Sequence, residues 1–265
     1  MDWVYKQIIG FLANFFAEMG NMGAEMFEMS WVQSIVLFFS YLAWSLYAVG
    51  FVVACAECGL EYSSGRADIK GTAMNLIKGF MAVSLFSVVP VKLYELCVSL
   101  QANFGYAISG AGASFGTVAG NIIDELTVEN FVDFATTHVG GFGSVTSPIM
   151  VLFCIILMAY AVIKVFFANL KRGGILLIQI AVGSLYMFSV PRGYLDGFYQ
   201  WCKQVVGLCL TAFLQATILI AGLTLFNEHA LLGLGLMLSA GEIPRIAGAF
   251  GLDTSTRANL SSAVY

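Results

Sequence analysis

The sequence contains very little charge. Only 11% of its 265 residues are Asp, Glu, Lys or Arg, while 59% are hydrophobic. Soluble globular chains carry about 25% charged residues, so a soluble domain of this length would lack the polar surface to cover itself. Proline is also scarce, with 4 residues against 28 glycines. Apolar, Gly-rich helices suit lipid because small residues let helix backbones approach closely. The composition predicts an integral membrane protein.

Two further features are missing, and each excludes a class of protein. The apolar run from Ile149 to Met158 does not alternate with polar residues, as strands of an outer-membrane barrel would. The N-terminus lacks the basic region and small-residue cleavage site of a secretory signal and carries Glu18, Glu25 and Glu28 instead. We therefore expect the mature helices themselves to direct insertion. The net charge of −4 argues against a large nucleic-acid-binding surface.

Catalytic and metal-binding motifs are absent too. The sequence has no HExxH motif, no nucleophile elbow and no phosphate-binding GxxxxGK[ST] loop. Cys55 and Cys58 form a lone CxxC pair, and His138 and His229 stand far apart. Structural zinc sites need more ligands at usable spacing. The sequence predicts no enzyme, no cofactor and no metal site.

The apolar runs predict an all-α, polytopic membrane protein. A run of about 20 apolar residues spans the bilayer as a helix, and about five such spans fit this chain. Runs at Ile149–Leu170 and Gly174–Val190 are joined by Lys171-Arg172-Gly173-Gly174. We expect these two runs to form a hairpin, with Lys171 and Arg172 at its cytoplasmic tip. The other expected spans are Trp31–Cys55, Thr72–Leu100 with a kink at Pro90, and Val205–Phe226.

The flanking segments differ from these spans. Residues 1–30 show an apolar seam at helical spacing with an acidic opposite face. We expect an amphipathic helix, either packed on another protein surface such as a second copy or lying in the membrane interface. We expect residues 31–241 to form the transmembrane helix bundle. Within it, 230–240 is too short to span and is either re-entrant or interfacial. We expect residues 242–265 to form a polar cytoplasmic tail.

The distribution of Lys and Arg predicts the orientation in the membrane. The 56–71 turn carries Arg66 and Lys70, whereas residues 100–147 carry no Lys or Arg at all. Basic connectors favour the cytoplasmic side, so the N-terminus should be outside, the C-terminus inside and 100–147 the main extracytoplasmic loop of a bacterial plasma-membrane protein. Arg192 and Lys203, in a connector assigned to the outside, are a mild exception. Candidate contact residues in the loop are Asp124, Glu125, Glu129, Asp133 and His138.

Ionisable or amide side chains at membrane depth are further candidates, because such groups are costly in lipid. Lys92 and Glu95 are spaced to pair on one helix face. Each charged candidate also lies near a span end, where a long side chain can reach water. Gln179 and Gln215 are expected to hydrogen-bond between helices. The full set is Lys78, Lys92, Glu95, Lys164, Gln179 and Gln215.

Several stretches of the second half resemble a known family. They are Phe166-Phe-Ala-Asn-Leu-Lys-Arg-Gly-Gly-Ile-Leu-Leu-Ile-Gln179, Val190-Pro-Arg-Gly-Tyr-Leu-Asp-Gly-Phe198 and Trp201-Cys-Lys-Gln-Val-Val-Gly-Leu-Cys-Leu-Thr-Ala-Phe-Leu-Gln215. The chain resembles TrbL-type conjugal transfer membrane proteins, in the compact form carried by conjugative elements of Gram-positive bacteria. These are polytopic inner-membrane subunits of type IV secretion machines.

The resemblance implies a channel or scaffold subunit that forms a homo-oligomer. Its implied partners are membrane lipid, an ATPase, a coupling protein, surface-side subunits and, transiently, single-stranded DNA. A path for single-stranded DNA should be basic and aromatic, yet the 100–147 loop is acidic. Either the loop contacts protein, or the path is non-adhesive. The alternatives are a small independent channel or secondary transporter, and a scaffold that conducts nothing.

Overall fold

The structure is a computed structural model, and it describes residues 26–66, 68–109 and 148–249. Every regular element in this part of the chain is helical, as the sequence predicts. The elements are η1 (Met26–Glu28), α3 (Ser30–Ser63), α4 (Ile69–Leu85), α5 (Val88–Ser109), α8 (Pro148–Tyr186), η2 (Val190–Arg192), α9 (Asp196–Glu228), α10 (Ala230–Ala240) and α11 (Ile243–Ala249).

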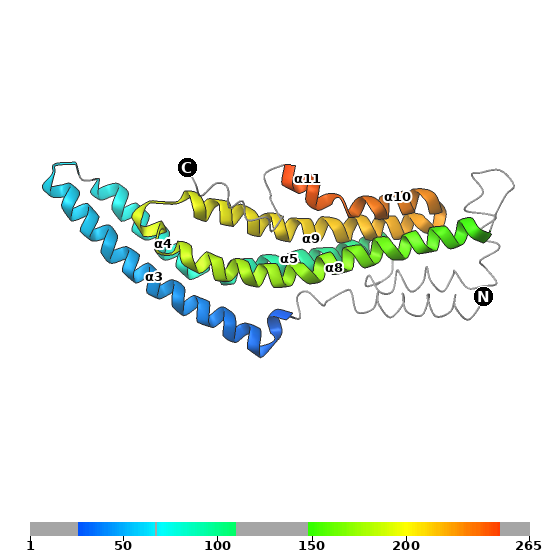
Figure 1. The fold of residues 1–265 in the computed structure, drawn as a ribbon, viewed down its shortest axis with the longest axis horizontal. Coiled ribbons are helices and arrows are strands. Elements are labelled where there is room, and N and C mark those ends of the chain that lie inside the picture. The colour runs from blue at the N-terminus through cyan, green and yellow to red at the C-terminus, as the bar shows by residue number, and fades with distance from the viewer. Residues whose placement is uncertain (1–25, 67, 110–147, 250–265) are drawn as a thin grey trace.

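The helices form an elongated bundle in which α5, α8 and α9 run lengthwise (Figure 1). Helix α9 contacts α5, α8 and α10, while α3 packs against α8 and α4. The apolar core follows these contacts, with buried side chains from Val83 on α4, Ile180 on α8 and Cys209 on α9. The α3–α4 turn and η2 lie at the same end of the bundle, because η2 contacts both α3 and α4.

Long apolar helices give the bundle its membrane character. Within the described residues, 3 helices are long and apolar enough to cross a membrane, or up to 4 if the bent pair α4–α5 counts as one span. The bend is 52°. Pro90 accounts for it: proline has no N–H to donate to the carbonyl four residues earlier, at Phe86. Helix α4 ends at Leu85, so the predicted kink is present.

The predicted hairpin at Lys171 and Arg172 is wrong. Helix α8 runs unbroken from Pro148 to Tyr186, 39 residues, and passes straight through Gly173 and Gly174. Glycine inside a helix costs only about 1 kcal/mol relative to alanine, which packing along a long helix offsets. Arg172 is 4% exposed and lies inside the bundle rather than at a tip. Because α8 is one helix, residues 149–190 of the described chain supply one crossing helix where the sequence predicted two.

The region after α9 turns back sharply. A single residue, His229, separates α9 from α10. The pairs Phe226–Gly233 and Gly222–Met237 are in close contact, so α10 packs antiparallel along α9. Its 11 residues return along the bundle, and both the re-entrant and the interfacial interpretation remain predictions. Other predicted segments fall partly outside the described residues: most of the amphipathic 1–30 helix does, as does the 100–147 loop beyond α5, which itself continues to Ser109.

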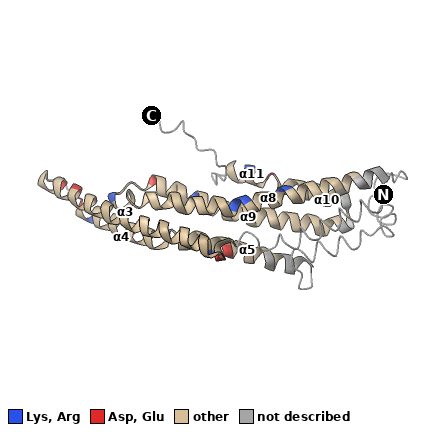
Figure 2. Cartoon of the chain, turned by 60° about the horizontal axis from the view of Figure 1, so that its bottom comes forward, with Lys and Arg blue, Asp and Glu red and all other residues tan. Residues whose placement is uncertain are grey.

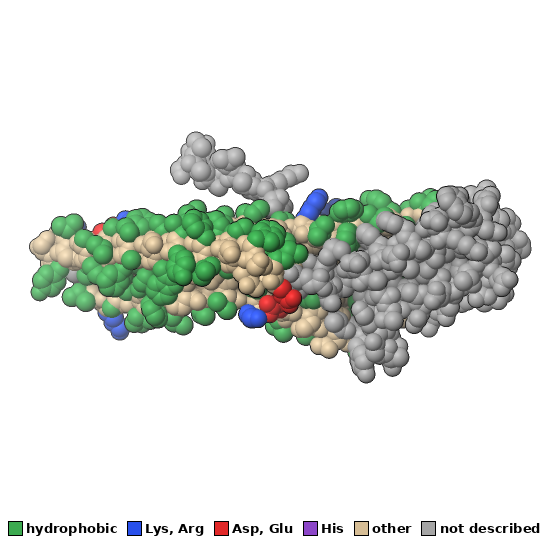
Figure 3. Space-filling view, turned by 90° about the horizontal axis from the view of Figure 1, so that it is seen from below, with side chains coloured by type: hydrophobic (Ala, Val, Ile, Leu, Met, Phe, Trp, Pro, Cys, Tyr) green, Lys and Arg blue, Asp and Glu red, His purple; other side chains and the backbone are tan. Residues whose placement is uncertain are grey.

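The outer surface is apolar over most of the described helices. Large exposed side chains include Phe38, Val52, Ile77 and Ile178, between 57% and 65% exposed. In Figure 2 the few charged positions of the described helices, coloured along the ribbon, lie mainly at one end and in the middle of the bundle. Figure 3 shows hydrophobic side chains covering the described half of one face, with charges near the middle. Such a surface is stable against lipid or other apolar helices, not against water.

One close helix contact gives a direct prediction. A Cβ at Gly50 of α3 would lie 2.5 Å from the carbonyl oxygen of Phe188, a backbone atom that cannot swing away. We expect Gly50→Ala to separate α3 from the turn that follows α8 and to lower the unfolding free energy by about 1–3 kcal/mol. Gly59→Ala on the same helix meets no atom within 4 Å and serves as the control. Unfolding by SDS in mixed micelles measures both; equal stability of the two variants would contradict the contact.

Candidate functional site

A buried polar cluster joins three helices in the middle of the bundle. Arg172 on α8 donates through Nη1 to the Asn169 side chain and through Nη2 to Oε1 of Gln215 on α9. Gln215 in turn donates through Nε2 to the Ala240 carbonyl at the end of α10, at 2.8 Å. Arg172 and Gln215 are 4% and 1% exposed. The cluster therefore fixes the register of α8, α9 and α10.

The charge of Arg172 makes this cluster costly to disturb. Within the described residues, none of the ion pairs involves Arg172. A buried charge is tolerated only when its donors find acceptors, and here two amide oxygens supply them. Removing one acceptor would leave guanidinium N–H groups unsatisfied in an apolar environment. The sequence indicated interhelical hydrogen bonding for Gln215, but not that its partner would be Arg172.

A second polar contact lies nearer the η2 end of α8 and α9. Gln179 Nε2 donates to Gln204 Oε1 at 3.1 Å, and the Trp201 indole donates to the Gln179 carbonyl at 2.7 Å. The Gln179 Oε1 atom is buried without a hydrogen-bond partner in the structure. Gln179 and Gln215 thus belong to two separate hydrogen-bonded groups. The interhelical bonding that the sequence predicted for both is present.

The charged candidates lie on the outside. Lys92 Nζ is 2.7 Å from Glu95 Oε2, as the spacing predicts, with side chains 69% and 41% exposed. Lys164 is exposed, with its ammonium 5.9 Å from the ring centre of Tyr160. Lys78 and Lys171 are also exposed. Among the described residues these side chains form no continuous polar path through the bundle interior.

One ion pair was missed by sequence reasoning. Arg192 of η2 donates through Nε to Glu57 of α3 at 3.1 Å, although the two residues are 135 positions apart. The hydrogen bond to Glu57 raises the pKa of Arg192 above its usual value. Gly193 follows in the left-handed region, with φ +90°, and turns the chain into α9. The connector that carries Arg192 therefore lies at the same end as the 56–71 turn, and its expected placement on the opposite side is wrong.

The remaining residues considered in the sequence analysis are the loop candidates and the possible metal ligands. Asp124, Glu125, Glu129, Asp133 and His138 lie outside the described residues. Within the described ranges, no group of three or more His, Cys, Asp or Glu side chains could hold a metal ion. The cysteines of the described part are free, including Cys55 and Cys58.

The fold and these polar contacts define a polytopic α-helical membrane protein whose interior groups join helices to one another. The comparison with protein families agrees with this class of protein and identifies the family. The family described as "Conjugal transfer protein TrbL" matches residues 1–265, and the chain belongs to this family. No curated protein and no solved structure matches the chain. The family identifies a component of the conjugal transfer, or type IV secretion, apparatus.

Proposed function

We propose that the chain is a membrane-embedded subunit of a conjugative type IV secretion machine that supports the passage of DNA, or protein, across the cytoplasmic membrane. The observation that carries the proposal is the family match over residues 1–265, joined to a bundle whose long helices are apolar outside. The interior contacts of Arg172 and Gln215 bind helix to helix. This arrangement suits a structural role, not catalysis.

The basic residues support one orientation. Arg66, Lys70 and Arg192 gather at the end of the bundle where α3 meets η2. Basic residues in short connectors favour the cytoplasm, so this end faces inward in our proposal. Two spans within 149–190 would place Arg192 outside, against the preference of basic residues for the cytoplasm. With α8 as a single helix, Arg192 lies at the proposed cytoplasmic end and agrees with that preference. Helix α5 leads away from this end to Ser109 (Figure 1), and in our proposal residues 110–147 belong to the extracytoplasmic side. The C-in assignment required two crossings within 149–190, and because α8 is a single helix over this range the assignment does not follow from the charge distribution.

The proposed assembly is a homo-oligomer that works with an ATPase, a coupling protein and surface-side subunits. Exposed apolar side chains on α3, among them Leu37, Tyr41 and Val49, offer a surface that a second copy can cover. The 110–147 segment carries acids and no Lys or Arg, which suits contact with a basic protein surface better than contact with DNA.

Deletion and complementation in donor cells test the proposal. We expect deletion of the gene for this chain to reduce transfer of the conjugative element to the assay background. The intact chain supplied in trans should restore transfer. The intact protein purified in detergent should have a mass that corresponds to several copies of the chain. The rival class, an independent channel or transporter, predicts a monomer that moves a solute in vesicles without other subunits. Normal transfer by the deletion strain would overturn the proposal.

A further inference from the structure

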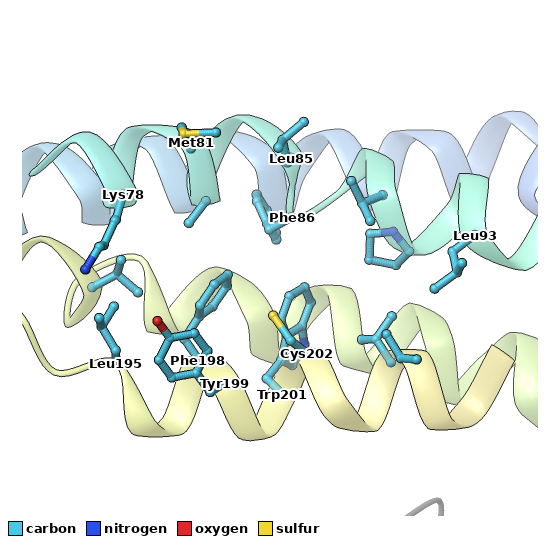
Figure 4. A pocket seen from close by; sticks show the side chains of 16 residues that line it. Lys78, Met81, Leu85, Phe86, Leu93, Leu195, Phe198, Tyr199, Trp201 and Cys202 are labelled. Atoms are coloured by element: carbon cyan, nitrogen blue, oxygen red, sulfur yellow. The ribbon is translucent and has the colours of Figure 1, made fainter. Parts of the chain in front are cut away.

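The bend between α4 and α5 leaves a cavity that the helix contacts do not fill. Its volume is about 380 Å³, and it lies between the α4–α5 bend on one side and η2 and the first turns of α9 on the other. Figure 4 shows Phe86 and Leu93 facing Phe198 and Cys202 across it. The cavity exists because α4 and α5 diverge by 52° at the break near Pro90, while α9 packs along α5 and η2 packs against α4.

The shape of the cavity is that of a narrow slot. Its lining covers Leu195 to Val206 on α9, about 16 Å at 1.5 Å per helical residue. One leaflet of the hydrocarbon core, half of about 30 Å, has a similar depth. A helix with side chains is about 10 Å in diameter, too wide for a slot of this volume and length. A single hydrocarbon chain fits it.

The lining is apolar along most of its length and has polar groups at one end, which matches the two parts of a phospholipid. The apolar part includes residues such as Leu85, Val89 and Val205. Figure 4 shows the Lys78 ammonium and the Tyr199 hydroxyl at one end, beside Leu195. Lys78 is in none of the ion pairs formed by the described residues. The slot therefore ends in a cation with no carboxylate partner in that part of the chain.

We propose that this cavity binds an anionic phospholipid, with one acyl chain in the slot between α4–α5 and α9 and the phosphate at the Lys78 ammonium. The Tyr199 hydroxyl can donate a second hydrogen bond to the phosphate or ester oxygens. The Lys78 end lies toward η2, the end that carries Arg192. An anionic leaflet concentrates its lipids near such a basic end. The proposal requires only that the chain lies in a membrane, so it can be tested independently of the secretion role.

Trp201 provides the readout, because it lines the slot and is 4% exposed. The full chain with Trp3→Phe, Trp31→Phe and Trp44→Phe keeps Trp201 as its one tryptophan. It is reconstituted in phosphatidylcholine vesicles containing a minor fraction of phosphatidylglycerol or phosphatidylcholine with brominated chains. Bromine quenches tryptophan fluorescence only at short range. We expect brominated phosphatidylglycerol to quench Trp201 several-fold more effectively than brominated phosphatidylcholine at the same fraction.

Two variants make the test specific. Lys78→Gln should abolish the preference for phosphatidylglycerol, while Lys203→Gln, an exposed lysine of α9 outside the lining, should retain it. Ala82→Leu narrows the slot and should reduce quenching by both lipids. Helical circular dichroism checks that each variant is folded. Equal quenching by the two lipids, or a preference that survives Lys78→Gln, would overturn the proposal. So would quenching that disappears as protein density rises, because a second copy would then occupy the slot.

Discussion

Gln215→Leu is expected to destabilise the bundle more than the double replacement Arg172→Met and Gln215→Leu. The single variant leaves the buried Arg172 guanidinium without the acceptor it has on α9. Breaking a buried charged contact from one side costs about 3–5 kcal/mol, whereas replacing both partners with apolar residues of similar size is often close to neutral. We expect a loss of about 3 kcal/mol for the single variant and about 1 kcal/mol for the double one.

The unfolding free energy of the purified chain in mixed SDS micelles measures the cycle. Gln204→Leu is the matched control, since it removes another glutamine of α9 that bonds to a neutral amide, Gln179, at 3.1 Å. Loss of that neutral bond should cost about 1 kcal/mol. If the double variant proves as unstable as Gln215→Leu alone, the guanidinium is not the group that Gln215 satisfies. Transfer assays with the same variants then show whether the cluster matters beyond stability.

Composition and periodicity predicted the fold class well because they report average solvent exposure. Low charge and long apolar runs indicated membrane helices, and Pro90 predicted the break that divides α4 from α5. The interhelical role of Gln179 and Gln215 also followed from their depth in apolar runs. Each of these inferences depends on a property of one segment, not on which segments meet.

The errors concern partners that lie far apart in the sequence. Lys171-Arg172-Gly173-Gly174 has the composition of a turn, and local reasoning placed a hairpin there. The helix continues because Arg172 finds acceptors at Asn169 and Gln215, the second 43 positions away. The Glu57–Arg192 pair was missed for the same reason. The cavity beneath the bend arises from the divergence of α4 and α5, and no single apolar run of the sequence indicates it.

The packing of α10 on α9 gives the other large expected effect, in Gly233→Ala. A Cβ at Gly233 would lie 2.5 Å from Cα and N of Phe226 and 2.6 Å from the Gly222 carbonyl oxygen. All three are backbone atoms, so relief requires α10 to move away from α9. That movement strains the Gln215–Ala240 hydrogen bond at the far end of α10. We expect a loss of at least about 2 kcal/mol in unfolding free energy and a sharp fall in element transfer.

Gly235→Ala is a control with the opposite expected sign. Gly235 lies two residues further along α10, and a Cβ there meets no atom within 4 Å. Because alanine is favoured over glycine in a helix by about 1 kcal/mol, Gly235→Ala should leave the bundle equally or more stable. The difference between the two variants then isolates the close approach of α9 and α10 from helix propensity. Two variants that change stability in the same direction would mean that α10 does not pack on α9 at Gly233. The register that links α10 to the Arg172 cluster would then be wrong as well.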